Sequence, residues 1–105
     1  MESPMKQGCL RAFAMLLTCV ASSALAADPS HGEAVVKRWC AGCHLVEPGQ
    51  RSSTEAPPFS AIAKRPDFDA SKVAFFLLEP HPKMPNMQLT RTEAADIAAY
   101  IATLK

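Results

Sequence analysis

Cys40, Cys43 and His44 bring two thiols and an imidazole together in one pentapeptide, Cys40-Ala41-Gly42-Cys43-His44. Two thiols at this spacing can form thioethers with the two vinyl groups of a porphyrin, because one short turn holds them at the required separation. The imidazole that directly follows then lies under the macrocycle, where it can ligate the iron. The pentapeptide therefore predicts one covalently attached haem c, with His44 as the proximal metal ligand.

The same cysteines have two alternative interpretations. In an oxidising compartment Cys40 and Cys43 could form a disulfide, although so small a loop restrains the unfolded chain only weakly. The segment 39–43 also looks locally like the active-site motif of a thioredoxin. That motif follows a buried strand, whereas residues 31–38 have helical character. We therefore favour haem attachment over thiol chemistry.

Residues 1–26 have the features of a secretory signal peptide: a basic start, an apolar core over 12–20, and the small residues Ala24-Leu25-Ala26 at its end. A transmembrane anchor is the alternative, but a span needs roughly 20 apolar residues and polar residues interrupt this stretch. A lipid anchor on Cys19 is disfavoured by the bulky residue before it. We expect export to the periplasm, cleavage near Ala26, and no stable membrane insertion afterwards.

The remaining segment, 27–105, is long enough for one small domain. The full chain carries 11 Lys and Arg against 10 Asp and Glu, and no basic run interleaved with aromatic residues indicates nucleic-acid binding. A domain of this size buries a modest core and usually needs an additional stabilising element, which a covalently held haem would supply. We expect a monomer.

The first half of this segment predicts two helices and a long loop. Asp28 and Pro29 are typical of an N-cap and a first helical position, so a helix should run to about Cys40. Its buried face should carry Val35, Val36 and Trp39. Residues 45–58 are rich in Pro, Ser and Gly and predict a loop. A short helical turn should follow over 59–64.

The second half predicts two further helices. Asp69 has the place of an N-cap for a helix over 70–79, with Val73, Phe76 and Leu77 on one face. Thr90-Arg91-Thr92-Glu93 is a capping box that opens the last helix. That helix carries a buried stripe at helical spacing: Ile97, Tyr100, Ile101 and Leu104. The chain shows no strand pattern, which predicts an all-α domain.

The segment 27–105 resembles a small bacterial class I c-type cytochrome, a single-haem fold of three to four helices and loops wrapped around one covalently attached haem. In that family a glycine eight residues before the first haem cysteine marks where the last helix crosses the first. Gly32 matches, with Val36 four residues on and the pair Ile97 and Tyr100 on the partner helix. Glycine lowers helix stability relative to alanine, so a glycine at position 32 indicates that another helix approaches the backbone closely there. The alternative is that the glycine is merely tolerated because it lies near a helix end.

The resemblance also implies haem-binding roles for Pro57 and Met84. Pro57 would offer its carbonyl to the outer N–H of His44, fixing the ring and raising its basicity; Pro58 is the neighbouring alternative. Met84 and Met87 lie in one proline-rich loop, where flexible apolar side chains are unusual. Met84 precedes a proline, as the sixth ligand commonly does in the family, which leaves Met87 for packing. His81 is a rival that would give bis-histidine ligation.

The resemblance implies a periplasmic electron-transfer protein with no catalytic residues of its own. His44 and Met84 would ligate the iron, and the partners would be larger exported or membrane-bound redox proteins. A haem-based ligand sensor or peroxidase-like enzyme with a labile sixth ligand is one alternative. A dedicated subunit of a dehydrogenase or oxidase complex is another. Candidate partners for the haem propionates are Arg51, Lys64 and Arg65, and candidate docking charges are Lys37, Lys64, Lys72 and Lys83.

Overall fold

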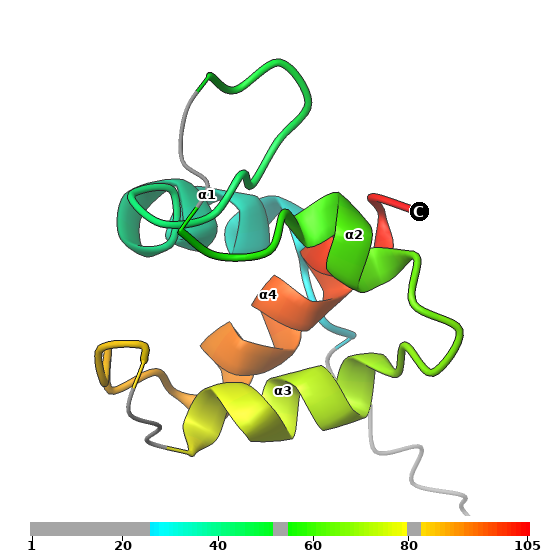
Figure 1. Ribbon diagram of the computed structural model, residues 1–105. Coiled ribbons are helices and arrows are strands. Elements are labelled where there is room, and N and C mark those ends of the chain that lie inside the picture. The colour runs from blue at the N-terminus through cyan, green and yellow to red at the C-terminus, as the bar shows by residue number, and fades with distance from the viewer. Residues whose placement is uncertain (1–25, 52–54, 80–82) are drawn as a thin grey trace, which may run out of the picture.

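Four α-helices and no strand make up the part of the chain that the computed structural model describes, residues 26–51, 55–79 and 83–105. The helices are α1 (Pro29–Trp39), α2 (Phe59–Ala63), α3 (Ala70–Leu78) and α4 (Arg91–Ala102) (Figure 1). The all-α fold is thus confirmed, with helix ends within about a residue of those predicted. The predicted leader, apart from Ala26, and the rival ligand His81 lie outside the described residues.

Local hydrogen bonds explain where three of the helices begin. The Asp28 carboxylate accepts from the backbone N–H of Ser30 at 2.9 Å in the first turn of α1. Asp69 caps α3 by accepting from the N–H of Lys72 at 3.0 Å. At α4 the capping box is complete. The Thr90 hydroxyl accepts from the N–H of Glu93 at 3.1 Å, and the Glu93 carboxylate accepts from the N–H of Thr90 at 2.8 Å. These bonds satisfy donors that a helix start leaves free.

α1 and α4 cross at Gly32, and the lack of a side chain there is required. A Cβ built on Gly32 would overlap the backbone carbonyl of Asp96 and lie 2.9 Å from the nitrogen of Ile97. Val36 and Ile97 are fully buried beside this contact. The crossing predicted from Gly32 is therefore confirmed, and the tolerance alternative is wrong. α4 also packs against α3, so it forms the centre of the bundle (Figure 1).

Trp39 does not belong to the core, contrary to the prediction from sequence: its side chain is 56% exposed. The buried stripe of this region runs through Gly32, Val36 and Cys40 at a spacing of four. Trp39 is the last residue of α1, and at this end of the helix the next residue, Cys40, takes the buried position. The guanidinium of Arg38 lies 5.2 Å from the centre of its ring, which shields one face of the indole.

Asp96 is a buried carboxylate at the helix crossing, 3% exposed. One oxygen accepts from the backbone N–H of Asp28 at 2.7 Å, and the other lies 2.7 Å from Nδ1 of His31. The Asp28 N–H, together with His31, holds the pKa of Asp96 below its usual value, although burial acts in the opposite direction. Asp96 thereby joins the start of α1 to α4, a contact across 68 residues of chain.

We expect this carboxylate to make the fold sensitive to acid. Its folded pKa lies below the unfolded value of about 3.9, so its contribution is complete above that pH and is lost as the pH falls through the folded pKa. Asp96→Asn should therefore flatten the dependence of stability on pH, by up to about 1.4 kcal/mol per pH unit. Urea midpoints of the two proteins between about pH 2 and 6 measure this. An equally steep dependence of stability on pH in the two proteins would contradict this role of Asp96.

Candidate functional site

A cavity of about 530 Å³ lies against the turn that carries Cys40 and His44. Its volume falls within the range of roughly 300–1,000 Å³ that is typical of cofactor sites. Apolar side chains from all parts of the fold form its walls: Phe59, Ile62, Phe68, Val73, Phe76, Leu77 and Ile101. Phe76, which the sequence places on one helix face with Val73 and Leu77, is 52% exposed and lines this space. The cavity therefore offers a large apolar surface inside a small domain.

Four of the five predicted site residues line this one cavity: Cys40, His44, Pro57 and Met84. The fifth, Cys43, is exposed on the same short turn, in which the N–H groups of Cys43 and His44 donate to the carbonyl of Cys40 at 3.2 and 2.9 Å. The turn thus holds two thiols and one imidazole close together, as the pentapeptide predicts.

His44 is held in a single orientation at the cavity wall, 8% exposed. Its Nδ1 donates to the carbonyl oxygen of Pro57 at 2.7 Å. The hydrogen bond is to Pro57 and not to the neighbouring Pro58, because the N–H of Phe59 donates to Leu45 at 2.9 Å and draws this segment alongside the turn. With Nδ1 carrying the proton, Nε2 is the nitrogen free to ligate a metal.

Of the two methionines in the 83–89 segment, Met84 lines the cavity and Met87 is not among its lining residues. Both side chains are half-buried. Met84 therefore reaches the same cavity as His44 from a distant part of the chain. This placement favours Met84 over Met87 as the sixth ligand.

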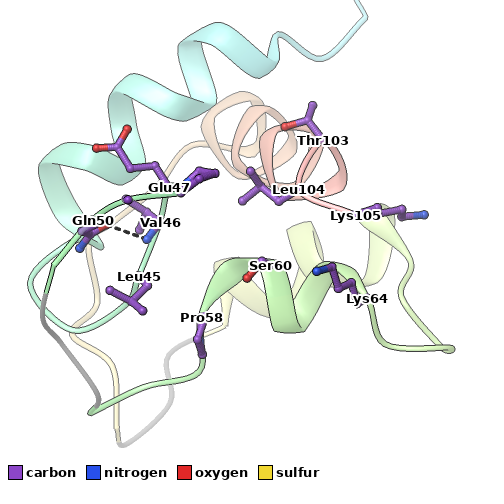
Figure 2. Close-up of a pocket in the computed structure, with 12 residues that line it drawn as sticks. Leu45, Val46, Glu47, Gln50, Pro58, Ser60, Lys64, Thr103, Leu104 and Lys105 are labelled. Atoms are coloured by element: carbon purple, nitrogen blue, oxygen red, sulfur yellow. Dashed lines mark hydrogen bonds between the residues drawn. The ribbon is translucent and has the colours of Figure 1, made fainter.

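One end of the cavity is charged, with Arg65, Asp67, Asp69 and Lys72 among its lining residues. Of the three candidate propionate partners, Arg65 lines this cavity. Lys64 instead lines a second cavity of about 530 Å³ between α2, the 45–50 loop and the end of α4 (Figure 2). Lys64 is the C-cap of α2 and Arg65 follows it outside the helix, and these neighbours in sequence line different cavities.

The thiol alternatives fit this site poorly. Burial raises the pKa of the Cys40 thiol to about 11, so almost none of it is thiolate at neutral pH, and the thiolate is the reactive form. The motif also follows α1 and not a strand, unlike the arrangement in a thioredoxin. Cys40 does line the cavity, so its sulfur lies beside any group that the cavity holds.

Comparison with known proteins agrees with this geometry. The family model for cytochrome c oxidase, cbb3-type, subunit III matches residues 27–101. The chain belongs to the small class I c-type cytochromes. It is 54% identical over 99 residues to cytochrome c-552 of Bradyrhizobium diazoefficiens, an alignment that covers 91% of this chain and 95% of that protein. No solved structure matches the chain significantly.

This cytochrome is a haem c electron-transfer protein, with the haem attached covalently through Cys40 and Cys43. The residues of this site fit the group: an apolar cavity of cofactor size, a turn with two thiols, and an imidazole whose Nδ1 already donates to Pro57. Within the described residues, none of the helices is long and apolar enough to cross a bilayer.

Sequence reasoning missed part of this cytochrome's cavity wall. Ile62 and Phe68 lie within the α2–α3 region and line the cavity, and Lys72 from the first turn of α3 joins its charged end. Phe68 is an apolar residue in an otherwise polar stretch, which is a weak signal of burial, whereas Ile62 belongs to the apolar run of α2. Lys72 was expected only as a docking charge at the surface, because a lysine in a first helical turn is ordinarily solvated.

Proposed function

We propose that this cytochrome is a periplasmic one-electron carrier whose iron is ligated by His44 and Met84. The observation that carries the proposal is that these two side chains, from distant segments, line one apolar cavity. No group of three or more His, Cys, Asp or Glu side chains suited to a metal occurs among the described residues. The leader predicted over 1–26 supports export.

The protein's contribution to the reaction is to hold two ligands and exclude water. When bound, haem c supplies a one-electron redox couple. Pro57 fixes the His44 ring and raises its basicity through the 2.7 Å hydrogen bond. Met84 offers a weak neutral sulfur donor, which favours the ferrous state and raises the potential relative to a second histidine. His44 and Met84 together would leave the iron no position for a substrate, so we assign no enzymatic activity.

A test with carbon monoxide separates the carrier from a ligand sensor or peroxidase-like enzyme. We expect the reduced protein at neutral pH to resist carbon monoxide, because Met84 occupies the sixth position. The measurement is the visible absorption spectrum of the reduced protein before and after addition of the gas. Rapid and complete binding would support the sensor or enzyme and contradict the carrier.

We propose that encounters with larger redox proteins are brief and only weakly steered by charge. The full chain has a net charge of +1. Of the candidate docking lysines, Lys37 is already paired with Glu33 at 2.8 Å and Glu47 at 3.2 Å. Electron-transfer rates should therefore fall by less than about tenfold with added salt, whereas strong steering accelerates association by up to about 10³. Stopped-flow rates with a redox partner measure this, and a steeper loss would reveal a strong local charge patch.

A second candidate is a dedicated subunit of an oxidase complex, and the description of the matched family favours it. The relative cytochrome c-552 favours the free carrier, because this chain spans 95% of that protein, which is therefore also a single small domain. Gentle purification distinguishes the two. A free carrier elutes alone at the size of one domain, whereas a subunit co-purifies with an oxidase in fixed ratio.

A further inference from the structure

We propose that Gln50 is a positioning residue for the proximal ligand, because its side-chain amide holds the turn that aims His44 into the haem cavity. The inference rests on the proposed ligation of iron by His44. Gln50 lies six residues beyond His44 in a loop without regular secondary structure, and it belongs to no motif in the sequence.

The Gln50 amide makes three hydrogen bonds to the backbone of the turn. Its oxygen accepts from the N–H of Val46 at 2.8 Å. Its nitrogen donates to the carbonyl of Ala41 at 3.1 Å and to the carbonyl of His44 at 3.0 Å. An amide has two donors and one acceptor oxygen, so both ends of this side chain are engaged. One side chain thus connects the middle of the haem motif to the residues that follow it.

These bonds replace the secondary structure that the turn lacks. Buried backbone groups need partners, and helices or sheets ordinarily provide them. Residues 43–46 have no helix to supply those partners, yet His44 is 8% exposed and Val46 is 1% exposed. Without Gln50, three backbone groups of the turn would lose a partner, two of them on these buried residues.

Val46 is held from two sides, which makes the turn rigid. Gln50 accepts from its N–H, and the hydroxyl of Tyr100 on α4 donates to its carbonyl at 2.6 Å. Tyr100 is itself buried in the core. The turn is therefore tied to the central helix through Val46 and closed on itself through Gln50. The backbone of His44 is fixed by Gln50, and its ring by Pro57.

Gln50 acts through the turn and not by touching the cofactor. It lies on the wall of the second cavity with Leu45 and Val46, where Figure 2 shows its hydrogen bond to Val46. It is not among the residues that line the haem cavity. A substitution of Gln50 can therefore affect the iron only by moving His44. That movement should lengthen the hydrogen bond from Nδ1 to Pro57 and make the imidazole a weaker ligand for the iron.

The test compares Gln50→Met with Thr90→Ala in the haem-loaded protein. Gln50→Met keeps the shape of the side chain and removes all three hydrogen bonds. Thr90→Ala removes the cap of α4, remote from the turn, and should lower the folding equilibrium constant about fivefold. We expect Gln50→Met to raise the midpoint potential, shifting the ferric–ferrous equilibrium on the order of tenfold, and to move the proton resonances of the ferric haem. Thr90→Ala should leave the potential and resonances unchanged.

Gln50→Leu likewise removes all three hydrogen bonds and adds no charge that would itself shift the potential, so the potential should rise as it does in Gln50→Met. This variant also carries the test if Gln50→Met yields too little protein. If the Gln50 variants lost stability as Thr90→Ala does but their midpoint potential stayed unchanged or fell, the positioning role of Gln50 would be overturned. The unmodified protein tests the ligation separately: ferric resonances that show His44 unbound would contradict the proposed function itself.

Discussion

Met84→Ala is expected to lower the midpoint potential and to remove the weak long-wavelength absorption band of ferric iron bound to a thioether sulfur. Met84 is the methionine that lines the cavity with His44. Loss of the neutral sulfur donor takes away the preference for the ferrous state. The fall should be about 0.1–0.3 V, within the window of roughly 0.8 V that axial ligands control. The open position should also bind carbon monoxide in the reduced protein.

Met87→Leu is the matched control, because Met87 lies in the same segment but does not line the cavity. It is close to a volume-conserving substitution and should cost less than about 1.5 kcal/mol of stability. The band and the potential should stay as they are in the unmodified protein. A band lost in the Met87 variant alone would assign the sulfur ligand to Met87. A band kept in both variants would show that either methionine can ligate the iron. A band absent already from the unmodified protein would exclude both methionines and leave His81 as the rival.

Gly32→Ala is expected to destabilise the protein although alanine is the better helix former. A Cβ at this position would overlap the backbone carbonyl of Asp96 on α4, which cannot rotate away as a flexible side chain can. Separating α1 from α4 should cost at least about 1–3 kcal/mol. Helix propensity alone predicts the opposite sign, a gain of about 1 kcal/mol. Chemical denaturation of the haem-loaded variant decides between them.

Ala34→Gly is the control for propensity, because Ala34 is exposed on the same helix. It should cost about 1 kcal/mol from helix propensity alone. The two substitutions are opposite in chemical sense, yet both should destabilise. If Gly32→Ala instead stabilised the protein by as much as Ala34→Gly destabilises it, the helix contact would be looser than the structure shows.

Short-range features of this cytochrome were predictable from sequence because they are decided within a few residues. Asp28, Asp69 and the box of Thr90 and Glu93 cap helices by hydrogen bonds that span two or three positions. Haem attachment is equally local, since both thiols and the imidazole lie in one pentapeptide. Gly32 was predictable for a different reason: a glycine within a helix needs a steric explanation.

Features that depend on contacts between distant segments could not be predicted from the spacing of residues in the sequence. Trp39 was expected in the core and is exposed, because the direction of the buried stripe of α1 is set by where α4 crosses it. Pro57 and Pro58 are equivalent in sequence, and only the fold shows which carbonyl meets His44. Likewise, only the fold places Met84 in the cavity wall and Met87 outside it.

The sequence by itself determined the helices, the haem motif and the all-α class, because capping, periodicity and thiol spacing act over one or two turns of chain. The tertiary structure alone decided the roles of Asp96 and Gln50. Asp96 is one acidic residue among ten in the sequence, yet folding buries it against the start of α1, 68 residues away. Gln50 belongs to no periodic pattern in the sequence. Its role arises only in the folded protein, where backbone groups of Val46 and His44 that lack helical partners form hydrogen bonds with its side-chain amide.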